Sequence, residues 1–319
     1  MSCNLGDKGW IKYGWGDLLD ESQGNHKIMT IDLTNYIIDR SVSALDAALS
    51  TVEKITNSYP APYTLMCSGG IDSQAMIWAW HLSGKPFEII SVKYISDGRI
   101  FNEHDLSGLQ EYCTTLKHSI NSIEFDLINF LENDLLEIAA LSECTSPHLC
   151  TYMKMSEVVS EGTVLFSGSP ILRTLPVGTK HTAISSPLQN TQLGMHRYGK
   201  VISTSTKQFI PFFFMHTAEL AYAFTNSYTP NLNSYERKVT MYHHGGFPVI
   251  AQSMKFTGFE VIKEYYDNMA HRVSLSDRVQ YAARPSKRVF DILFRHKNSI
   301  VMPKNATWKD ICINKYINT

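Results

Sequence analysis

The hydrophobic pattern alternates between helix-like and strand-like segments from about residue 31 to residue 170. Apolar residues recur at three- and four-residue steps over 31–58, which predicts a helix that Pro60 and Pro62 end. Short apolar runs predict strands at 63–67, 87–94, 119–125 and 163–166. Helices are predicted between them at 72–82, 102–117, 126–141 and from Pro147 to about 160. This alternation indicates a parallel α/β sheet with right-handed crossovers.

The pattern changes beyond residue 170. Residues 170–207 are rich in Thr, Ser, Gly and Pro and have no clear period, which is typical of a long substrate loop or lid. Residues 211–319 are predicted to be mainly helical, with helices at 213–225, 258–270 and 286–297. The first 30 residues mix glycine with aromatic residues, and we expect an ordered but irregular arm.

Composition narrows the class of protein. The chain has 319 residues, 44% of them hydrophobic and 18% charged, which is enough apolar material for a sizeable core. The formal net charge of -1 argues against a dedicated nucleic-acid binder but allows a local basic patch. The six cysteines include no C-x-x-C pair and fit reduced thiols. We find neither a signal peptide nor a run of about 18 apolar residues, so we expect a cytoplasmic protein without membrane contact.

The most informative segment is Leu65-Met66-Cys67-Ser68-Gly69-Gly70-Ile71-Asp72-Ser73. A predicted strand runs through Ser-Gly-Gly directly into a predicted helix. The glycines allow close approach of the backbone to a ligand, and the helix start adds its dipole and unpaired N–H groups, which together make an anion site. Ser68 and Ser73 add hydroxyl donors. Asp72 would repel a bare phosphate, so its presence indicates a cation, most simply Mg²⁺ on a polyphosphate. The alternative is a plain turn in which Asp72 caps the helix.

The string S-G-G-I-D-S at 68–73 resembles the S-G-G-x-D-S signature of the PP-loop ATP pyrophosphatases. That family includes asparagine synthetase, GMP synthetase, NAD synthetase and several tRNA-modifying ligases. The resemblance covers about residues 60–170 and implies a Rossmann-like α/β fold. It also implies cleavage of ATP between the α and β phosphates, with Ser68, Gly69, Gly70, Ile71, Asp72 and Ser73 around the pyrophosphate and Asp72 as a Mg²⁺ ligand.

Two further segments are similar to the family pattern. Asn102 and Asp105 resemble an N-x-x-D helix start found after the second strand in several members, although an ordinary Asn102 N-cap explains them equally well. Ser167-Gly168 resembles the strand end at which asparagine synthetase-like domains approach the nucleotide. Those domains continue with an acidic residue, whereas this chain continues Ser169-Pro170, so the second metal carboxylate is in doubt. Asp97, Glu103 and Asp105 are the candidates to replace it.

Adenylylation needs positive charge where the departing pyrophosphate builds negative charge. The candidates after the fourth predicted strand are Arg173, Lys180, Arg197 and Lys207, and each is alternatively a solvated surface charge. We name Lys180 and Arg173 as the catalytic candidates, because Lys180 lies among small residues that suit a closing lid. We expect an arm and helix at 1–59, an ATP-binding α/β domain at 60–205 and a mainly helical substrate or lid region at 206–319.

Two Cys and His clusters invite a metal interpretation. Cys144, His148 and Cys150 lie within seven positions and Cys113 could join them, but the spacing matches no standard zinc pattern. Buried structural thiols explain these cysteines better, and sulfur transfer is a further alternative. Adjacent residues His243 and His244 point in different directions on regular structure, so a turn with one hydrogen-bonded histidine is the better interpretation.

The segment from 284 to 309 is basic, with seven Lys or Arg residues against Asp291 alone. It predicts either a solvated helix face, which we favour, a patch for nucleic acid or an acidic partner, or substrate-pocket residues.

Three hypotheses follow. The first is an ATP-dependent ligase that adenylylates a carbonyl or carboxylate of a small-molecule acceptor with Mg²⁺. Only about 60 residues precede the loop, so we expect no glutaminase domain, and the nitrogen comes from ammonia, an amine or a partner glutaminase. The second is a PP-loop enzyme that modifies a tRNA or DNA base. The third is a nucleotide-binding regulator with reduced catalysis.

Overall fold

The fold comes from a computed structural model. It describes residues 11–14, 28–32, 41–96, 99–100, 102–142, 147–168, 173–174, 182–184, 195, 198–226 and 235–250. Predicted helices 258–270 and 286–297 and the basic segment 284–309 lie outside these residues.

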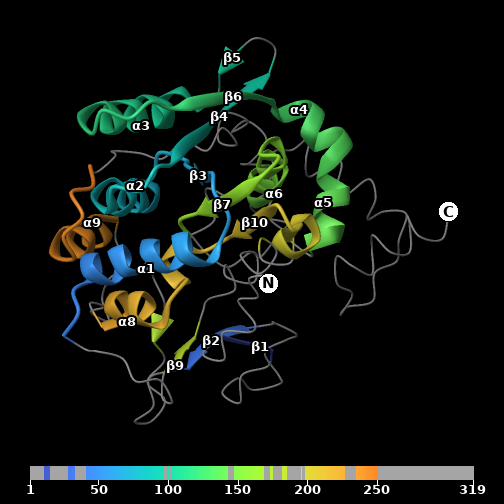
Figure 1. The fold of residues 1–319 in the computed structure, drawn as a ribbon. Coiled ribbons are helices and arrows are strands. Elements are labelled where there is room, and N and C mark those ends of the chain that lie inside the picture. Colours follow the sequence, from blue (N-terminus) through green and yellow to red (C-terminus); the bar gives the residue numbers. More distant parts are fainter. Residues whose placement is uncertain are drawn as a thin grey trace, which may run out of the picture.

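Five parallel strands form the central sheet (Figure 1). Its strands are β3 (Tyr63–Met66), β4 (Glu88–Ser96), β6 (Asn121–Asp126), β7 (Gly162–Phe166) and β10 (Lys207–Ile210). The order across the sheet is β6-β4-β3-β7-β10, and the short β5 (Arg99–Ile100) pairs antiparallel with the end of β4. The predicted Rossmann-like α/β class is therefore confirmed.

Successive strand residues point to opposite faces of the sheet, so it has a core on each side. Leu65 and Ile89 lie in the core under α1 (Ala44–Ser58), α2 (Ile71–Ser83), α3 (Glu103–Thr115), α8 (Ala218–Asn226) and α9 (Tyr235–His244). Met66 and Ile90 lie in the core under α4 (Leu127–Asn129), the π-helical turn Phe130–Asp134, α5 (Leu135–Ser142) and α6 (Pro147–Met155). Figure 1 shows the two helical layers on either side of the sheet.

A second, antiparallel sheet has the order β1-β2-β9-β8. Its strands are β1 (Ile11–Gly14), β2 (Ile28–Asp32), β9 (Thr182–Ile184) and β8 (Arg173–Thr174). This sheet pairs strands from the N-terminal segment, where we expected an irregular arm, with strands from residues 170–207, where we expected a lid loop. Both expectations missed these strands, because each is too short to show a period.

Three other predictions need correction. The helix predicted over 31–58 begins only at Ala44, because the Ser43 hydroxyl accepts from the Asp46 amide and starts α1 there, while 28–32 is strand β2. The helix predicted over 213–225 is a 3₁₀ turn at Phe213–Met215 followed by α8. Strand β10 was missed because its four residues are all buried and do not alternate.

The domain limits expected at 59/60 and 205/206 stay a prediction. β10 starts two residues beyond the second limit and pairs with β7, and α1, before the first, packs on the same core. Among the described residues, no helix is both long and apolar enough to cross a membrane.

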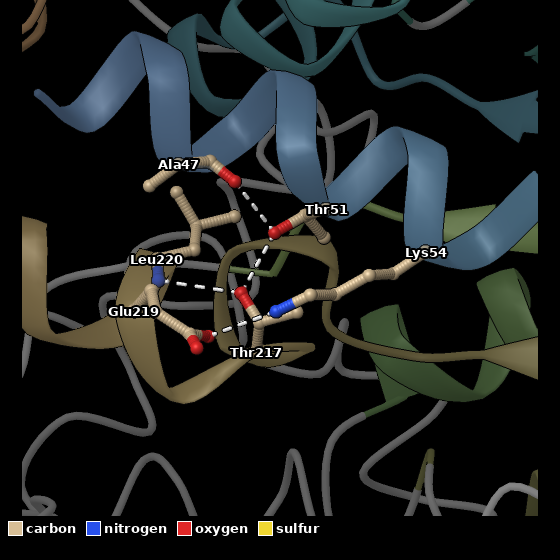
Figure 2. A network of polar contacts seen from close by, with 6 residues as sticks. All are labelled: Ala47, Thr51, Lys54, Thr217, Glu219 and Leu220. Carbon is tan, nitrogen blue, oxygen red and sulfur yellow. Dashed lines mark hydrogen bonds and ion pairs between the residues drawn. The ribbon is translucent and has the colours of Figure 1, made fainter. Parts of the chain in front are cut away.

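A buried chain of hydrogen bonds joins α1 to α8 (Figure 2). The Thr51 hydroxyl donates to the Ala47 carbonyl at 2.8 Å and lies 2.7 Å from the Thr217 hydroxyl. Since Thr51 has one proton and gives it to Ala47, Thr217 donates to Thr51. The Leu220 amide then donates to Thr217, which starts α8 at this residue. Each of the two buried hydroxyls therefore donates one hydrogen bond and accepts another.

We expect Thr51→Val to lower the free energy of unfolding by about 2 kcal/mol, because it removes the acceptor of a buried hydroxyl. Thr51→Ser keeps the hydroxyl, so its free energy of unfolding should fall clearly less. Lys54→Met serves as the contrast in the same helix. The Lys54–Glu219 pair in Figure 2 is exposed, so its loss should cost no more than about 0.5 kcal/mol. Urea denaturation measures all three variants, and an equal loss in Thr51→Val and Lys54→Met would contradict the prediction.

Candidate functional site

The loop predicted to bind phosphate lies where β3 leaves the sheet. The Cys67 amide still pairs with the Ile90 carbonyl at 2.8 Å, and the Ser68 amide then turns to the Ser73 hydroxyl at 3.2 Å. Gly69 has a φ of +79°, and a Cβ there would lie 2.5 Å from the Asp105 carbonyl oxygen. Gly70 is the N-cap residue of α2 and has no side chain to cap it. The strand, loop and helix therefore follow one another as predicted.

The second predicted loop, Ser167-Gly168, leaves the adjacent strand. Met66 of β3 and Phe166 of β7 are paired in register, so the two loops start side by side at the carboxyl edge of the sheet. Gly168 has a φ of +65°, and a Cβ there would lie 2.8 Å from the Phe212 ring. The strand order reverses between β3 and β7, and ligands of open α/β sheets bind at such switch points.

A small cavity lies on the other side of the loop, between the ends of β3 and β4. Its lining residues are Cys67, Ser68, Ser91, Val92, Tyr94, Asn102, Asp105 and Tyr152. The cavity has a volume of about 10 Å³, which is at most room for one water molecule and too little for a nucleotide.

The side chain of Asn102 binds the backbone of β4 beside this cavity. Its side-chain amide donates to the Val92 carbonyl at 2.6 Å, and its side-chain oxygen accepts from the Tyr94 amide at 2.9 Å. It thus pairs with β4 like a neighbouring strand. It occupies the N-cap position of α3 but makes no side-chain cap bond, so the ordinary N-cap interpretation is wrong. Asp105, one turn further on, is buried beside the loop.

Tyr152 of α6 reaches the loop from the opposite helical layer. Its hydroxyl hydrogen-bonds with the side chains of Ser68 and Tyr94. Burial, and then the nearby Tyr94, raise the pKa of Tyr152, so its hydroxyl keeps its proton. The Tyr94 hydroxyl in turn lies 2.8 Å from that of Thr151. Sequence reasoning missed Tyr152, which carried no motif.

Asp72, in the first turn of α2, has protein donors on both carboxylate oxygens. The Lys238 ammonium lies 2.5 Å from Oδ2, and the Tyr242 hydroxyl donates to Oδ1. Burial, and then the negative charge of Asp72, raise the pKa of Tyr242. Lys238 and Tyr242 are four residues apart on α9 and so share one helix face. That spacing was a signal in the sequence, but no helix was predicted there.

A Mg²⁺ ion at Asp72 does not fit this arrangement. Each of its carboxylate oxygens accepts a hydrogen bond from α9, and the positive charge of the Lys238 ammonium at Oδ2 disfavours a second cation there. Within the described parts of the chain, no three His, Cys, Asp or Glu side chains gather as possible ligands of a metal ion. A Mg²⁺ ion that arrives with the nucleotide is part of the substrate and stays a prediction.

Among the basic candidates, the structure describes only Lys207 and the backbone of Arg173. Lys207 opens β10, where its ammonium donates to the Ser156 carbonyl at 2.9 Å. It pairs with Gly162, the first residue of β7, so it lies at the amino end of the sheet, opposite the loops. Arg173 contributes its backbone to β8. Lys180 and Arg197 lie outside the described residues, as do Asp97 and Ser169-Pro170, so the roles of Lys180 and Arg173 stay predictions.

The cysteine cluster does not assemble as a four-ligand zinc site. Cys113 lies in the core on one face of the sheet and Cys150 in the core on the other. Burial raises the pKa of Cys113 to about 12, so it remains a neutral thiol. Cys144 lies outside the described residues. His243 lies in the last turn of α9 with its Nε2 2.8 Å from the Val249 carbonyl oxygen, which supports the interpretation of one hydrogen-bonded histidine.

A histidine pair joins the end of α2 to the segment after α3. His81 Nδ1 and His118 Nε2 lie 3.0 Å apart, so one ring donates to the other. Burial, and then the charge of His81, lower the pKa of His118 below its usual 6.5. The unfolded chain therefore takes up this proton first as the pH falls. The stability that the pair contributes is present above pH 6.5 and is lost below it.

We expect the free energy of unfolding to fall as the pH drops from about 7 to about 5, partly because of this pair. His118→Gln should make that fall shallower. The exposed His244 provides the control, since His244→Gln should leave the pH dependence unchanged. Urea denaturation at three pH values measures the slope, and an unchanged slope in His118→Gln would contradict the assignment.

Comparisons with known proteins give a likeness of structure only. No protein-family description matches the chain, and no curated protein matches it. Solved structures that match include an NH3-dependent NAD synthetase from Campylobacter jejuni in complex with nitrate. It is 12% identical with a TM-score of 0.32, and the match covers 82% of this chain and 96% of that one. At these values the likeness carries no information about activity.

Proposed function

We propose that this chain is an ATP-dependent ligase of the PP-loop type that adenylylates a small-molecule acceptor. The observation that carries the proposal is the loop at Ser68–Ser73. It stands at the switch point of a parallel sheet, and Gly69 adopts a φ of +79° against the Asp105 carbonyl. This geometry supports a site for the phosphates of a nucleotide, because the loop leads into the N-terminus of α2 at the carboxyl edge, and helix N-termini attract anions.

The proposed reaction has two steps. An oxygen of the acceptor carboxylate or carbonyl attacks the α phosphorus of ATP, and the bond to the bridging oxygen breaks so that pyrophosphate leaves. The nitrogen of ammonia or an amine then attacks the activated carbon and releases a proton to solvent, while the bond from carbon to the AMP oxygen breaks and AMP leaves with its electron pair. In the first step negative charge accumulates on the pyrophosphate, and the dipole at the N-terminus of α2 stabilises this charge.

Gly168 and Ser167 support the placement of the nucleotide. A side chain at Gly168 would meet Phe212, and the Phe214 amide donates to the Ser167 carbonyl at 3.3 Å. This second loop is thereby fixed beside the first. We infer that the two loops together flank the phosphates and that the acceptor approaches at the carboxyl edge of β7 and β10.

The experiment follows ATP with the purified chain, Mg²⁺, ammonium and a panel of small carboxylic acids and amides. Acceptor-dependent formation of AMP and pyrophosphate supports the ligase. ADP and phosphate as products would contradict it, because they report cleavage at the other phosphate bond. Tight ATP binding without turnover across the panel would favour the regulator. The nucleic-acid alternative rests on the basic segment 284–309, and salt-sensitive RNA binding lost on neutralising Lys287, Arg288 and Arg295 would favour it.

A further inference from the structure

We propose that the Lys238 ammonium supplies the positive charge of the phosphate site at the Ser68–Ser73 loop. Asp72 is then a positioning residue that holds Lys238 at the loop, and it is not a metal ligand. The inference rests on the proposed function and names the charge that its phosphate site uses. It starts from the contact between the Lys238 ammonium and Asp72 Oδ2, which are 2.5 Å apart.

The ion pair is largely removed from solvent. The side chains of Lys238 and Asp72 are 16% and 24% exposed, so salt screens their attraction much less than that of a surface pair. The Tyr242 hydroxyl donates to the second oxygen of Asp72. Asp72 therefore has its charge balanced by groups from α9, about 170 residues away in sequence.

The segment that follows α9 is fixed to α2 by further contacts. The side chain of Gln74 accepts from the Ile250 amide at 2.7 Å and donates to the Ile250 carbonyl at 3.3 Å. The Trp78 indole donates to the Gly246 carbonyl at 3.1 Å. α9 and the segment after it thus run along α2 from its first turn, as Figure 1 shows for the two helices.

Tyr242 anchors the same helix from the inside. It is buried and packs in an aromatic cluster with Phe214, Phe224 and Phe247, with ring centroids 5.5–5.8 Å apart. Lys238 lies one turn before it on the same face. Its ammonium is therefore held at the loop by the core, unlike a lysine on a surface helix.

The pairing resolves a conflict in the loop. A carboxylate in the first turn of α2 would repel a phosphate that the N–H groups attract. With Lys238 bound to Asp72, the pair is neutral, and the ammonium can offer hydrogens to a phosphate oxygen beside the helix start. Lys238 makes and breaks no covalent bond in this role. It stabilises the negative charge that the leaving pyrophosphate gains.

The test measures binding of inorganic pyrophosphate by calorimetry, in EDTA and in Mg²⁺. Wild-type protein should bind it in EDTA. Lys238→Met should weaken this binding at least about tenfold, as expected for loss of one charge-assisted hydrogen bond. Lys238→Arg, which keeps the charge, should retain most of the affinity. Lys85→Met, at an exposed lysine beyond the other end of α2, should leave it unchanged.

A double-mutant cycle separates a positioning residue from a metal ligand. If Asp72 acts through Lys238, Asp72→Asn should weaken binding in EDTA, and adding it to Lys238→Met should cost little more. If instead Asp72→Asn affects only binding in Mg²⁺ while Lys238→Met has no effect, Asp72 is a metal ligand and the inference is wrong. No pyrophosphate binding by wild-type protein in EDTA would also overturn it. Thermal unfolding checks that each variant is folded.

The two proposals fail separately. Wild-type protein that forms AMP, with Lys238→Met equally active and equally tight for pyrophosphate, would refute the role of Lys238 and leave the ligase standing. Pyrophosphate binding through Lys238 without AMP formation on any acceptor would refute the ligase and leave the cation assignment standing.

Discussion

Gly69→Ala is expected to reduce the formation of AMP and pyrophosphate about 100-fold, because it must move the loop by about 1 Å. The new Cβ would lie 2.5 Å from the Asp105 carbonyl oxygen, where ordinary contacts begin near 3.4 Å. The neighbour is backbone at the start of α3, so it cannot rotate away as a side chain could. A φ of +79° adds about 1 kcal/mol of strain for alanine. Steady-state kinetics with the acceptor found in the panel measures the loss.

Gly84→Ala is the matched control. Gly84 ends the same helix, has a φ of +65°, and nothing lies within 4 Å of a Cβ built there. Its alanine variant should carry the same strain of about 1 kcal/mol but leave activity intact. If the two variants lose activity equally, the effect comes from general destabilisation, and the close approach of Gly69 to Asp105 does not matter for the loop.

The sequence predicted the sheet because its strands are marked by strong local signals. Apolar runs such as 63–67 and 163–166 are bounded by glycine or proline and separated by helical periods. β10 carried no such signal, since Lys207–Ile210 is buried on both faces and lacks alternation. A strand of this kind is specified by its neighbour β7, which supplies the pairing, and not by its own pattern.

The residues of the candidate site also fall into two groups, those marked by a local sequence signal and those brought in by long-range packing. Gly69 and Gly168 were singled out as positions of close backbone approach, and both have a positive φ that glycine adopts without strain. Their role at a nucleotide stays a prediction. Lys238 and Tyr242 could not be placed, because their contact with Asp72 spans more than 160 residues and depends on how α9 docks on α2. The metal expected at Asp72 followed from its charge and from the family resemblance, and neither could show that the Lys238 ammonium, which belongs to another element, pairs with this carboxylate.

Asn102→Asp is expected to lower the free energy of unfolding by about 3 kcal/mol at pH 7.5, because it puts a buried carboxylate against a carbonyl. The replaced amide donates to the Val92 carbonyl at 2.6 Å. The bond from the Tyr94 amide to the other oxygen is kept, so shape and one contact are unchanged. Asn121→Asp, at an exposed position on β6, provides the same chemical change without burial and should cost no more than about 0.5 kcal/mol.

The pH dependence of the stability of Asn102→Asp tests whether the buried carboxylate causes the loss. Burial beside the Val92 carbonyl should raise the pKa of the new carboxyl above its unfolded value, so the folded state binds the proton more tightly. The penalty is then small at low pH, where the protonated carboxyl donates to Val92, and grows as the pH rises. A helix N-cap accepts aspartate as readily as asparagine, so an N-cap at this position would show no such loss. Urea denaturation at pH 5 and 7.5 therefore tests whether the Asn102 side chain pairs with β4 or caps α3. An Asn102→Asp variant as stable as Asn121→Asp at both pH values would contradict the pairing and support the N-cap interpretation.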